Sequence, residues 1–337
     1  MVKVGIVGLG SLGTRHAVNV MHRTPGAKLL AVCGREQTVN RFTDKHGPVQ
    51  YTHHSYDEML KNREIDAILI VTPVSLHAEM VVKAMEAGFH VFVEKPIGLT
   101  TEEATRAAAA AEARPDKVFM TGFMRRFDPS YAEAKRKIDA GEIGTPIMFR
   151  GYSLDADAAP ESAPDRGEKN GAWFPEMLVH DIDLARWFLG GEVETIRTIG
   201  GCYKHKAFEK YNDVDNACTL MGFTNRAMAT LYTGRTAAHG SHVETEIVGT
   251  EGMFRISPVP SRDRVTIYGK GGVRVECVED YLERFDEAFV REMNEFVNCI
   301  AEGRKPAMTP RDSRMVSEAA NAAYEAYLSG TLVTLKR

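Results

Sequence analysis

The chain has 337 residues, of which 44% are hydrophobic and 26% are charged, and its formal net charge is -4. These values describe an ordinary globular chain of about two domains, without the basic surplus of a nucleic-acid-binding protein. No apolar run is long enough to span a bilayer, and the N-terminus enters a strand without a signal-peptide pattern. We therefore expect a cytoplasmic protein with neither a nucleic acid nor a membrane as partner.

The first predicted elements are a strand and a helix joined by a glycine-rich turn. Residues 2–7 are apolar and rich in β-branched residues, as in a buried parallel strand, and residues 12–21 follow a helical pattern. Between them, Gly8 permits a tight turn, Gly10 lets the backbone approach a pyrophosphate, and Gly13 lets the helix pack closely on the strand. The N-terminus of the helix adds N–H groups that bind phosphate. This arrangement predicts a dinucleotide site.

The end of the second predicted strand, residues 28–33, bears on which dinucleotide binds. An acidic residue about 20 positions past the glycines binds the ribose hydroxyls of NAD, but Gly34 and Arg35 stand there instead. A guanidinium suits the 2′-phosphate of NADP, so NADP is slightly favoured over NAD. In the alternative interpretation Arg35 only stacks on adenine and Glu36 binds the ribose, and we expect dual use before strict selectivity.

Strand and helix signals alternate as far as Gly122, which predicts βαβ units around a parallel sheet in a first domain of residues 1–122. Two of these strands, residues 65–71 and 90–94, are followed by Thr72-Pro73 and by Lys95. Ligands of open α/β sheets bind outside the carboxyl ends of the strands. We therefore expect the chemistry at Lys95.

Residues 123–337 have a different character and are predicted to form a second, α+β domain with an open, mainly antiparallel sheet. Helices are expected over residues 131–140, 285–300 and 311–328, and a loop near the active site over residues 155–171. A sheet with a free face commonly mediates assembly, so we expect a homodimer or homotetramer. Strands are expected over residues 147–154, 193–203, 215–223, 227–233, 242–249 and 265–268.

A second group of chemically active residues lies in the predicted helix that begins near Pro175. Glu176, His180 and Asp183 fall at positions i, i+4 and i+7 and share one face. A carboxylate beside a histidine orients the imidazole and raises its pKa, as a general acid/base requires. The alternative is a structural histidine at a helix start, with a salt bridge to Arg186. No metal site is expected, because the chain offers no second cluster of obvious ligands.

Together these motifs resemble the Gfo/Idh/MocA family of oxidoreductases, and within it the members similar to inositol dehydrogenases. The resemblance covers nearly the whole chain. It rests on Gly8 to Gly13, Thr72-Pro73 with His77, Glu94-Lys95-Pro96, residues 122–129, His180-Asp181-Ile182-Asp183, residues 249–252 and Glu283-Arg284-Phe285.

The resemblance implies an N-terminal Rossmann domain and hydride transfer between a polyol or sugar carbon and nicotinamide. Lys95 and His180 then flank the reacting hydroxyl. Glu176 stands where inositol dehydrogenases commonly have an aspartate, so the polyol pocket is expected to differ from the pocket of those enzymes. We expect Lys95, His180 and Glu176 to be catalytic, and the substrate to meet these three together with Arg125 and His239, although both of the latter could be surface residues. The expected cofactor contacts are Gly8, Gly10, Ser11, Leu12, Gly13, Gly34, Arg35, Thr72, Pro73, His77, Glu94, Lys95 and Pro96.

Two other functions remain open at this point. Some members of the family keep nicotinamide bound and process glycosides in a redox-neutral cycle, and others are regulatory proteins without catalysis. Because an acid/base pair is not needed for binding alone, Lys95 and His180 favour an enzyme over a regulator.

Overall fold

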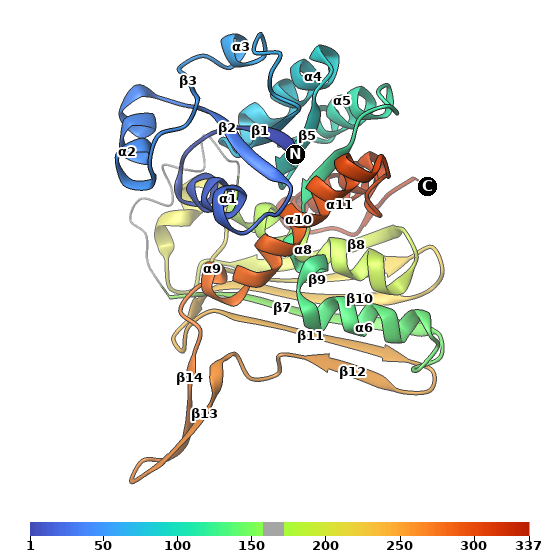
Figure 1. Ribbon diagram of the computed structural model, residues 1–337. Helices are drawn as coiled ribbons and strands as arrows, with labels where there is room; N and C mark the ends of the chain where they lie inside the picture. Colours follow the sequence, from blue (N-terminus) through green and yellow to red (C-terminus); the bar gives the residue numbers. More distant parts are fainter. Residues whose placement is uncertain (158–171, 337) are drawn as a thin grey trace. The chain divides into compact units, whose positions relative to one another are not determined.

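The structure is a computed structural model that describes residues 1–157 and 172–336 (Figure 1). By its internal contacts the chain divides into two units. The first unit is formed by Met1–Met124 and Glu287–Glu318, and the second by Arg125–Asp286 and Ala319–Arg337. Of the predicted loop over residues 155–171, the part from 158 onward lies outside the described residues.

The first unit contains a six-stranded sheet with the strand order β3-β2-β1-β4-β5-β6. Every neighbouring pair in this sheet is parallel. This is the strand order of a doubly wound dinucleotide-binding fold, in which the order reverses between β1 and β4. The strands are β1 (Val2–Val7), β2 (Ala27–Cys33), β3 (Tyr51–His53), β4 (Ala67–Ile70), β5 (His90–Glu94) and β6 (Phe119–Gly122).

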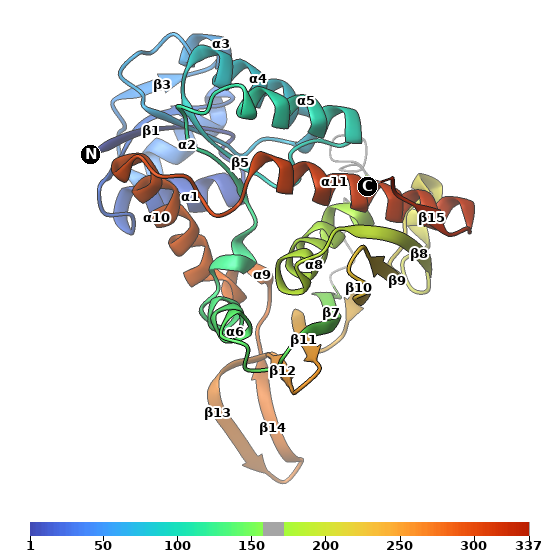
Figure 2. The same cartoon turned by 90° about the vertical axis from the view of Figure 1, so that its right-hand side faces the viewer.

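Helices lie on both faces of this sheet, with α4 and α5 on one side and α1 and α10 on the other (Figure 2). Strand β5 explains why both faces are covered, because its side chains point alternately into two apolar layers. Val91 and Val93 belong to the core that α4 and α5 cover, whereas the Phe92 ring meets Phe296 of α10 edge to face at 5.8 Å. The helices of this unit are α1 (Ser11–His22), α2 (Glu36–His46), α3 (Tyr56–Met59), η1 (Val74–Leu76), α4 (His77–Ala87), α5 (Thr101–Glu112) and α10 (Asp286–Glu302).

Local signals explain where several of these helices begin and end. The Thr100 side chain accepts a hydrogen bond from the N–H of Glu103 and caps α5. Gly88 follows α4 in the left-handed conformation, with φ at 90°, and ends the helix.

The second unit contains a seven-stranded sheet with the strand order β12-β11-β7-β10-β9-β8-β15. All its neighbouring pairs are antiparallel except β7 and β10, which run parallel. The predicted fold class is therefore confirmed. The strands are β7 (Pro146–Ala156), β8 (Val193–Gly201), β9 (Asn216–Phe223), β10 (Met228–Ala237), β11 (His242–Gly249), β12 (Met253–Ile256) and β15 (Val333–Thr334).

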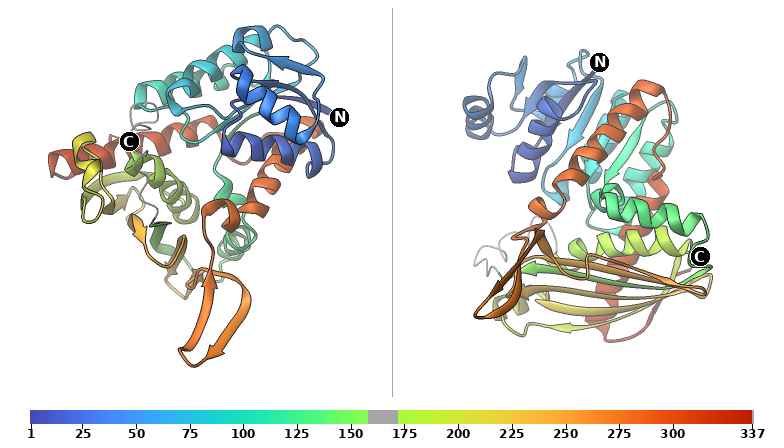
Figure 3. Two further views of the ribbon diagram at one scale, coloured as in Figure 1. Left: turned by 90° about the vertical axis from the view of Figure 1, so that its left-hand side faces the viewer. Right: turned by 60° about the horizontal axis from the view of Figure 1, so that its bottom comes forward.

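Helix α8 packs on one face of this sheet against β7 and β10, and among the described residues of this unit no helix lies on the opposite face (Figure 3). Burial alternates along β9, as expected for a sheet with one covered and one open face. Thr219 and Met221 are buried, and Leu220 between them is exposed. Strands β13 (Ser261–Gly269) and β14 (Gly272–Cys277) form a separate hairpin. The helices in the described part of this unit are η2 (Met124–Phe127), α6 (Pro129–Asp139), α8 (Trp173–Leu189), η3 (Lys206–Tyr211) and α9 (Tyr281–Arg284), while α11 (Pro310–Ser329) continues from the first unit into the second.

Among the residues that the structure describes, no helix is long and apolar enough to cross a membrane.

Candidate active site

The glycine turn after β1 has the geometry that close approach to a phosphate requires. Gly8 has a φ of +93°, and a Cβ on it would lie 2.2 Å from the carbonyl oxygen of Val71. A Cβ on Gly13 would lie 1.8 Å from the carbonyl oxygen of Gly8, so α1 can approach β1 only because this side chain is absent. A Cβ on Gly10, by contrast, would meet nothing within 4 Å. The turn is thus tightly packed at its base and open at Gly10, which fits a pyrophosphate.

Helix α1 begins directly after this open position. Gly10 is its N-cap, and no acidic residue lies in its first turn, so no carboxylate competes with an anion for the positive end of the helix. Ser11 is exposed and Leu12 is half-buried at this end. These residues can hold the phosphates of a dinucleotide.

The carboxyl end of β2 presents Gly34 and Arg35. Arg35 is the N-cap residue of α2, and its side chain is exposed, as is that of Glu36 beside it. Arg35, considered for the 2′-phosphate of NADP, and Glu36, considered for the ribose, are therefore both accessible to a ligand.

His77 connects two loops at the carboxyl edge of the parallel sheet. It is buried, its Nδ1 lies 2.8 Å from the carbonyl oxygen of Pro96, and its Nε2 lies 2.8 Å from that of Thr72. The imidazole can donate to both oxygens only when it carries two protons. His77 thus fixes the loop of Thr72 and Pro73 to the segment that carries Lys95.

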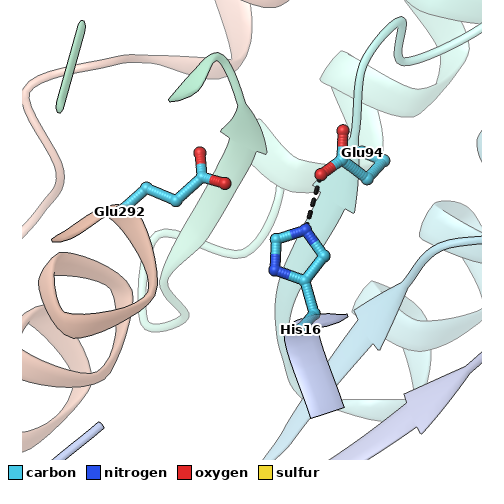
Figure 4. Close-up of side chains that lie close together, drawn as sticks. All are labelled: His16, Glu94 and Glu292. Atoms are coloured by element: carbon cyan, nitrogen blue, oxygen red, sulfur yellow. Dashed lines mark hydrogen bonds and ion pairs between the residues drawn. The ribbon is translucent and has the colours of Figure 1, made fainter. Parts of the chain in front are cut away.

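Glu94 ends β5 with a buried carboxylate that has two partners. Its Oε1 lies 2.7 Å from the Nε2 of His16 (Figure 4). Its Oε2 accepts a 3.2 Å hydrogen bond from the backbone N–H of Lys95. Lys95 itself is half-buried and Pro96 is buried. The carboxylate therefore holds the backbone at the first residue beyond the strand.

The residues after β1, β4 and β5 lie on neighbouring strands of one sheet. The first unit thus brings the glycine turn, Thr72-Pro73 and Lys95 to the same carboxyl edge, as the sequence predicted.

Helix α8 of the second unit carries Glu176 and His180. Its first N–H groups are capped from another segment, because the Asp213 carboxylate accepts from the N–H of Trp173 at 2.7 Å and of Phe174 at 3.2 Å. Burial raises the pKa of Asp213, and these hydrogen bonds oppose that shift. Glu176 is half-buried and His180 is buried one turn further along the helix.

The two aspartates that follow His180 are bound by arginines. Nη1 of Arg125 lies 2.9 Å from Oδ1 of Asp181 and 2.9 Å from Oγ of Ser153. Burial raises the pKa of Asp181, and the positive charge of Arg125 opposes that rise. Asp183 accepts two hydrogen bonds from Arg126, at 2.8 and 2.7 Å. The Asp183 carboxylate is thus held by Arg126 in a bidentate ion pair.

The two predicted substrate contacts outside α8 occupy different surroundings. Arg125 is only 3% exposed, and its guanidinium is bound within the second unit. His239 is exposed in the turn between β10 and β11, with its Nε2 3.2 Å from the Nδ1 of His242.

Sequence reasoning missed several residues that shape these surroundings. Asp213 lies 40 positions from Trp173, which it caps. Arg235 of β10 places its guanidinium carbon 4.0 Å from the centre of the Trp173 ring and 4.5 Å from that of Phe208. Neither residue belongs to a local motif, so no signal in the sequence marked them. His16, in contrast, lies three residues after Gly13 in the same helix, so it could have been noticed there.

Comparison with known proteins assigns the family. Residues 2–123 match the family model described as "Oxidoreductase family, NAD-binding Rossmann fold", and residues 131–255 match the GFO/IDH/MocA C-terminal domain. The chain belongs to the Gfo/Idh/MocA family. The predicted family is thereby confirmed, and so is the enzyme class, an oxidoreductase with an NAD-binding Rossmann fold.

Several members of the Gfo/Idh/MocA family are similar over nearly their whole length. The scyllo-inositol 2-dehydrogenase (NAD(+)) of Bacillus subtilis is 37% identical, over 99% of this chain and 96% of that protein. The myo-inositol 2-dehydrogenase of Thermotoga maritima is 29% identical, over 93% of this chain and 92% of that protein. The crystal structure of scyllo-inositol dehydrogenase from Lactobacillus casei with bound cofactor NAD(H) and scyllo-inositol is 36% identical and has a TM-score of 0.95, with 99% of both chains covered.

Proposed function

We propose that this protein is an inositol dehydrogenase, which oxidises a secondary hydroxyl of a cyclic polyol to a ketone and reduces NAD(P)+. The observation that carries the proposal is the 37% identity, over nearly the full length of both chains, with a scyllo-inositol 2-dehydrogenase. The predicted acid/base residues and the open glycine turn are present in the same chain.

His180 is the general base in this proposal. It takes the hydroxyl proton of the substrate. A bound nicotinamide would supply the acceptor for the hydride that leaves the same carbon. Glu176 lies one helical turn before His180, where its carboxylate orients the neutral imidazole and stabilises the positive charge that the imidazole gains when it takes the proton. Its side chain is one methylene longer than an aspartate, so the polyol pocket of this enzyme differs in shape at that point.

Lys95 stabilises the negative charge that develops on the substrate oxygen. A partly desolvated ammonium group stabilises such a charge best when the backbone of its lysine is fixed before the reaction. The hydrogen bonds of Glu94 and His77 to the Lys95-Pro96 segment provide that fixation.

Both nicotinamide cofactors are used in this proposal, with Arg35 binding the 2′-phosphate of NADP and Glu36 the ribose of NAD. The exposure of both side chains at the end of β2 supports this dual use. Of the substrate contacts expected from the sequence, we retain Lys95, Glu176 and His180. Arg125 is engaged with Asp181, and we assign it the support of α8 instead.

The proposed assembly is a homo-oligomer formed through the open face of the second-unit sheet. Strand register places four exposed apolar side chains on that face. Such a patch on a sheet is typical of a contact with a second copy. The residues are Ile199, Leu220, Met228 and Met253.

The experiment that tests the function measures the initial rate of NAD+ and NADP+ reduction with scyllo-inositol, myo-inositol, common aldoses and glycosides. The proposal requires turnover with at least one inositol, and a substantially lower kcat/KM with the aldoses. Turnover of glycosides alone, with nicotinamide already bound to the purified protein, would instead establish the redox-neutral reaction.

A further inference from the structure

Three titratable side chains meet inside the first unit. His16 comes from α1, Glu94 from the end of β5 and Glu292 from the middle of α10, and one ligand atom from each lies within 4.8 Å of the others (Figure 4). His16 and Glu292 are completely buried, and Glu94 is 5% exposed. Residues from distant parts of the chain thus share one enclosed polar cluster.

The surroundings of this cluster are apolar. The His16 ring meets Phe92 edge to face at 5.4 Å and Phe289 of α10 at 5.7 Å. Within the described chain, neither carboxylate oxygen of Glu292 has a hydrogen-bond partner, and Nδ1 of His16 has none either. Glu292 therefore points into the cluster without a cation or a donor to compensate an ionised carboxylate.

A carboxylate in such a place is far more costly than a carboxylic acid, since burial penalises only the charged form strongly. The second carboxylate of the cluster adds repulsion. Both effects act in the same direction, and burial together with the charge of Glu94 raises the pKa of Glu292 well above its ordinary value. The neutral acid also supplies a donor, which an ionised Glu292 lacks.

A bound divalent cation is the other way to neutralise the cluster, and the geometry favours the proton. Metal ligands at about 2.0–2.2 Å from a zinc ion are about 3 Å or more from one another. The His16 and Glu94 atoms are 2.7 Å apart, which is a hydrogen-bond distance. The side chains of the neighbouring Phe92 and Phe289 add no ligand atom.

The cluster is connected to the proposed catalytic lysine through Glu94. One oxygen of Glu94 faces His16 and the other accepts from the backbone N–H of Lys95. Gly122 borders this carboxylate so closely that a Cβ there would lie 3.0 Å from it. Any movement of the Glu94 carboxylate therefore also disturbs the backbone of Lys95.

We propose that Glu292 is a positioning residue. As a neutral acid beside His16 and Glu94, it supplies the hydrogen-bond donor that fixes the Glu94 carboxylate, and this carboxylate holds the backbone of Lys95. The inference rests on the proposed function only in taking Lys95 as catalytic. The proton on Glu292 and the order of the Lys95 backbone are properties of the folded protein that can be measured without substrate.

The test compares Glu292→Gln, which retains a neutral donor, with Glu292→Met, which has similar length but no hydrogen-bonding head. Glu287→Gln, on the exposed surface of α10, is the matched control. We expect the infrared spectrum of the wild type to contain the carbonyl band of a buried protonated carboxyl, and this band to be missing only in the two Glu292 variants. Hydrogen exchange at the Lys95 amide should be faster in Glu292→Met and unchanged in Glu292→Gln.

With an inositol as substrate, Glu292→Met should lower kcat about tenfold or more, because a small misplacement of a catalytic group is costly. The KM for the cofactor should change less, and Glu292→Gln should retain most of the wild-type kcat. Absence of the protonated band, equal exchange and kcat in the Gln and Met variants, or a stoichiometric metal ion that Glu292→Gln releases would overturn the inference. If no inositol is oxidised, the proposed function fails, while the infrared and exchange results still decide the inference.

Discussion

Lys95 is the residue on which the proposed chemistry depends most. Lys95→Met keeps the length of the side chain and removes its charge, so it should leave the glycine turn and cofactor binding intact. We expect kcat to fall by about 100-fold or more, because a preorganised charge acts mainly on the transition state. Steady-state rates and a fluorescence titration with NADH measure the two effects separately. A variant that keeps more than about a tenth of the wild-type kcat would show that Lys95 does not have this role.

Arg35 decides how well the two cofactors are distinguished. Arg35→Ala removes a charge-assisted contact to the 2′-phosphate, so KM for NADP+ should rise about tenfold or more while KM for NAD+ changes little. The measurement is the ratio of kcat/KM for the two cofactors. An equal loss with both would assign Arg35 to the adenine instead.

Glu292 makes stability depend on pH in a defined direction. Its pKa lies above the ordinary value of 4.5 in the folded protein, so folding favours the bound proton. The free energy of unfolding should therefore lose this contribution as the pH rises from about 4.5 through the folded pKa. Glu292→Gln lacks the titration, so its stability relative to the wild type should increase with pH across that window. Urea unfolding at a series of pH values measures the difference, and a constant difference would contradict the raised pKa.

The roles of some of these residues could be predicted from the sequence, and the roles of others could not. The glycines of the turn could be interpreted because their roles depend on neighbours a few positions away, and Gly8 and Gly13 have the packing that this interpretation requires. The contact between His16 and Glu94 joins residues 78 positions apart, and Glu292 reaches the same place from near the other end of the chain. Such pairings are products of the tertiary fold, and a single sequence has no local pattern that indicates them.

At the scale of elements, helix α8 is stabilised from outside its own sequence. Ala172 is its N-cap and provides no side-chain hydrogen bond, while Asp213 binds the first N–H groups. Asp213→Ala should lower the free energy of unfolding by about 1–2 kcal/mol, as loss of a helix cap does. Urea unfolding measures this effect. Because α8 carries Glu176 and His180, kcat should fall as well.

Asp280→Ala provides the control, since Asp280 caps the short helix α9 in the same unit. It should cost some stability without lowering kcat. Equal loss of kcat in both variants would indicate that Asp213 has no specific effect on the acid/base residues.

Most helices and strands could be predicted where their periodicity is strong. The strand expected over residues 242–249 has the same limits in the structure. Strand β7 continues to Ala156, into the region expected to be a loop, because its partner β10 extends to Ala237. The parallel pairing of β7 and β10 could not be predicted, since alternation along one strand does not indicate the direction of its neighbour.

At the scale of the whole molecule, the open sheet face predicts assembly. Leu220→Glu replaces one of the exposed apolar side chains of this face with a charge, which would be buried at the contact in an oligomer. We expect the variant to have a lower molar mass than the wild type by light scattering, with unchanged secondary structure. Lys45→Glu, an exposed charge change on α2, is the control. Equal molar masses for the wild type and Leu220→Glu would exclude this face as the contact.

The whole-molecule claim is that this chain transfers hydride from a polyol carbon to nicotinamide, and isotope transfer tests it most directly. The enzyme is incubated with NAD+ and scyllo-inositol carrying deuterium on carbon, and the reduced cofactor is analysed by mass spectrometry. We predict one deuterium at C4 of the nicotinamide and a slower initial rate than with unlabelled scyllo-inositol. Reduced cofactor without deuterium, or no reduction with any inositol, would contradict the proposed function.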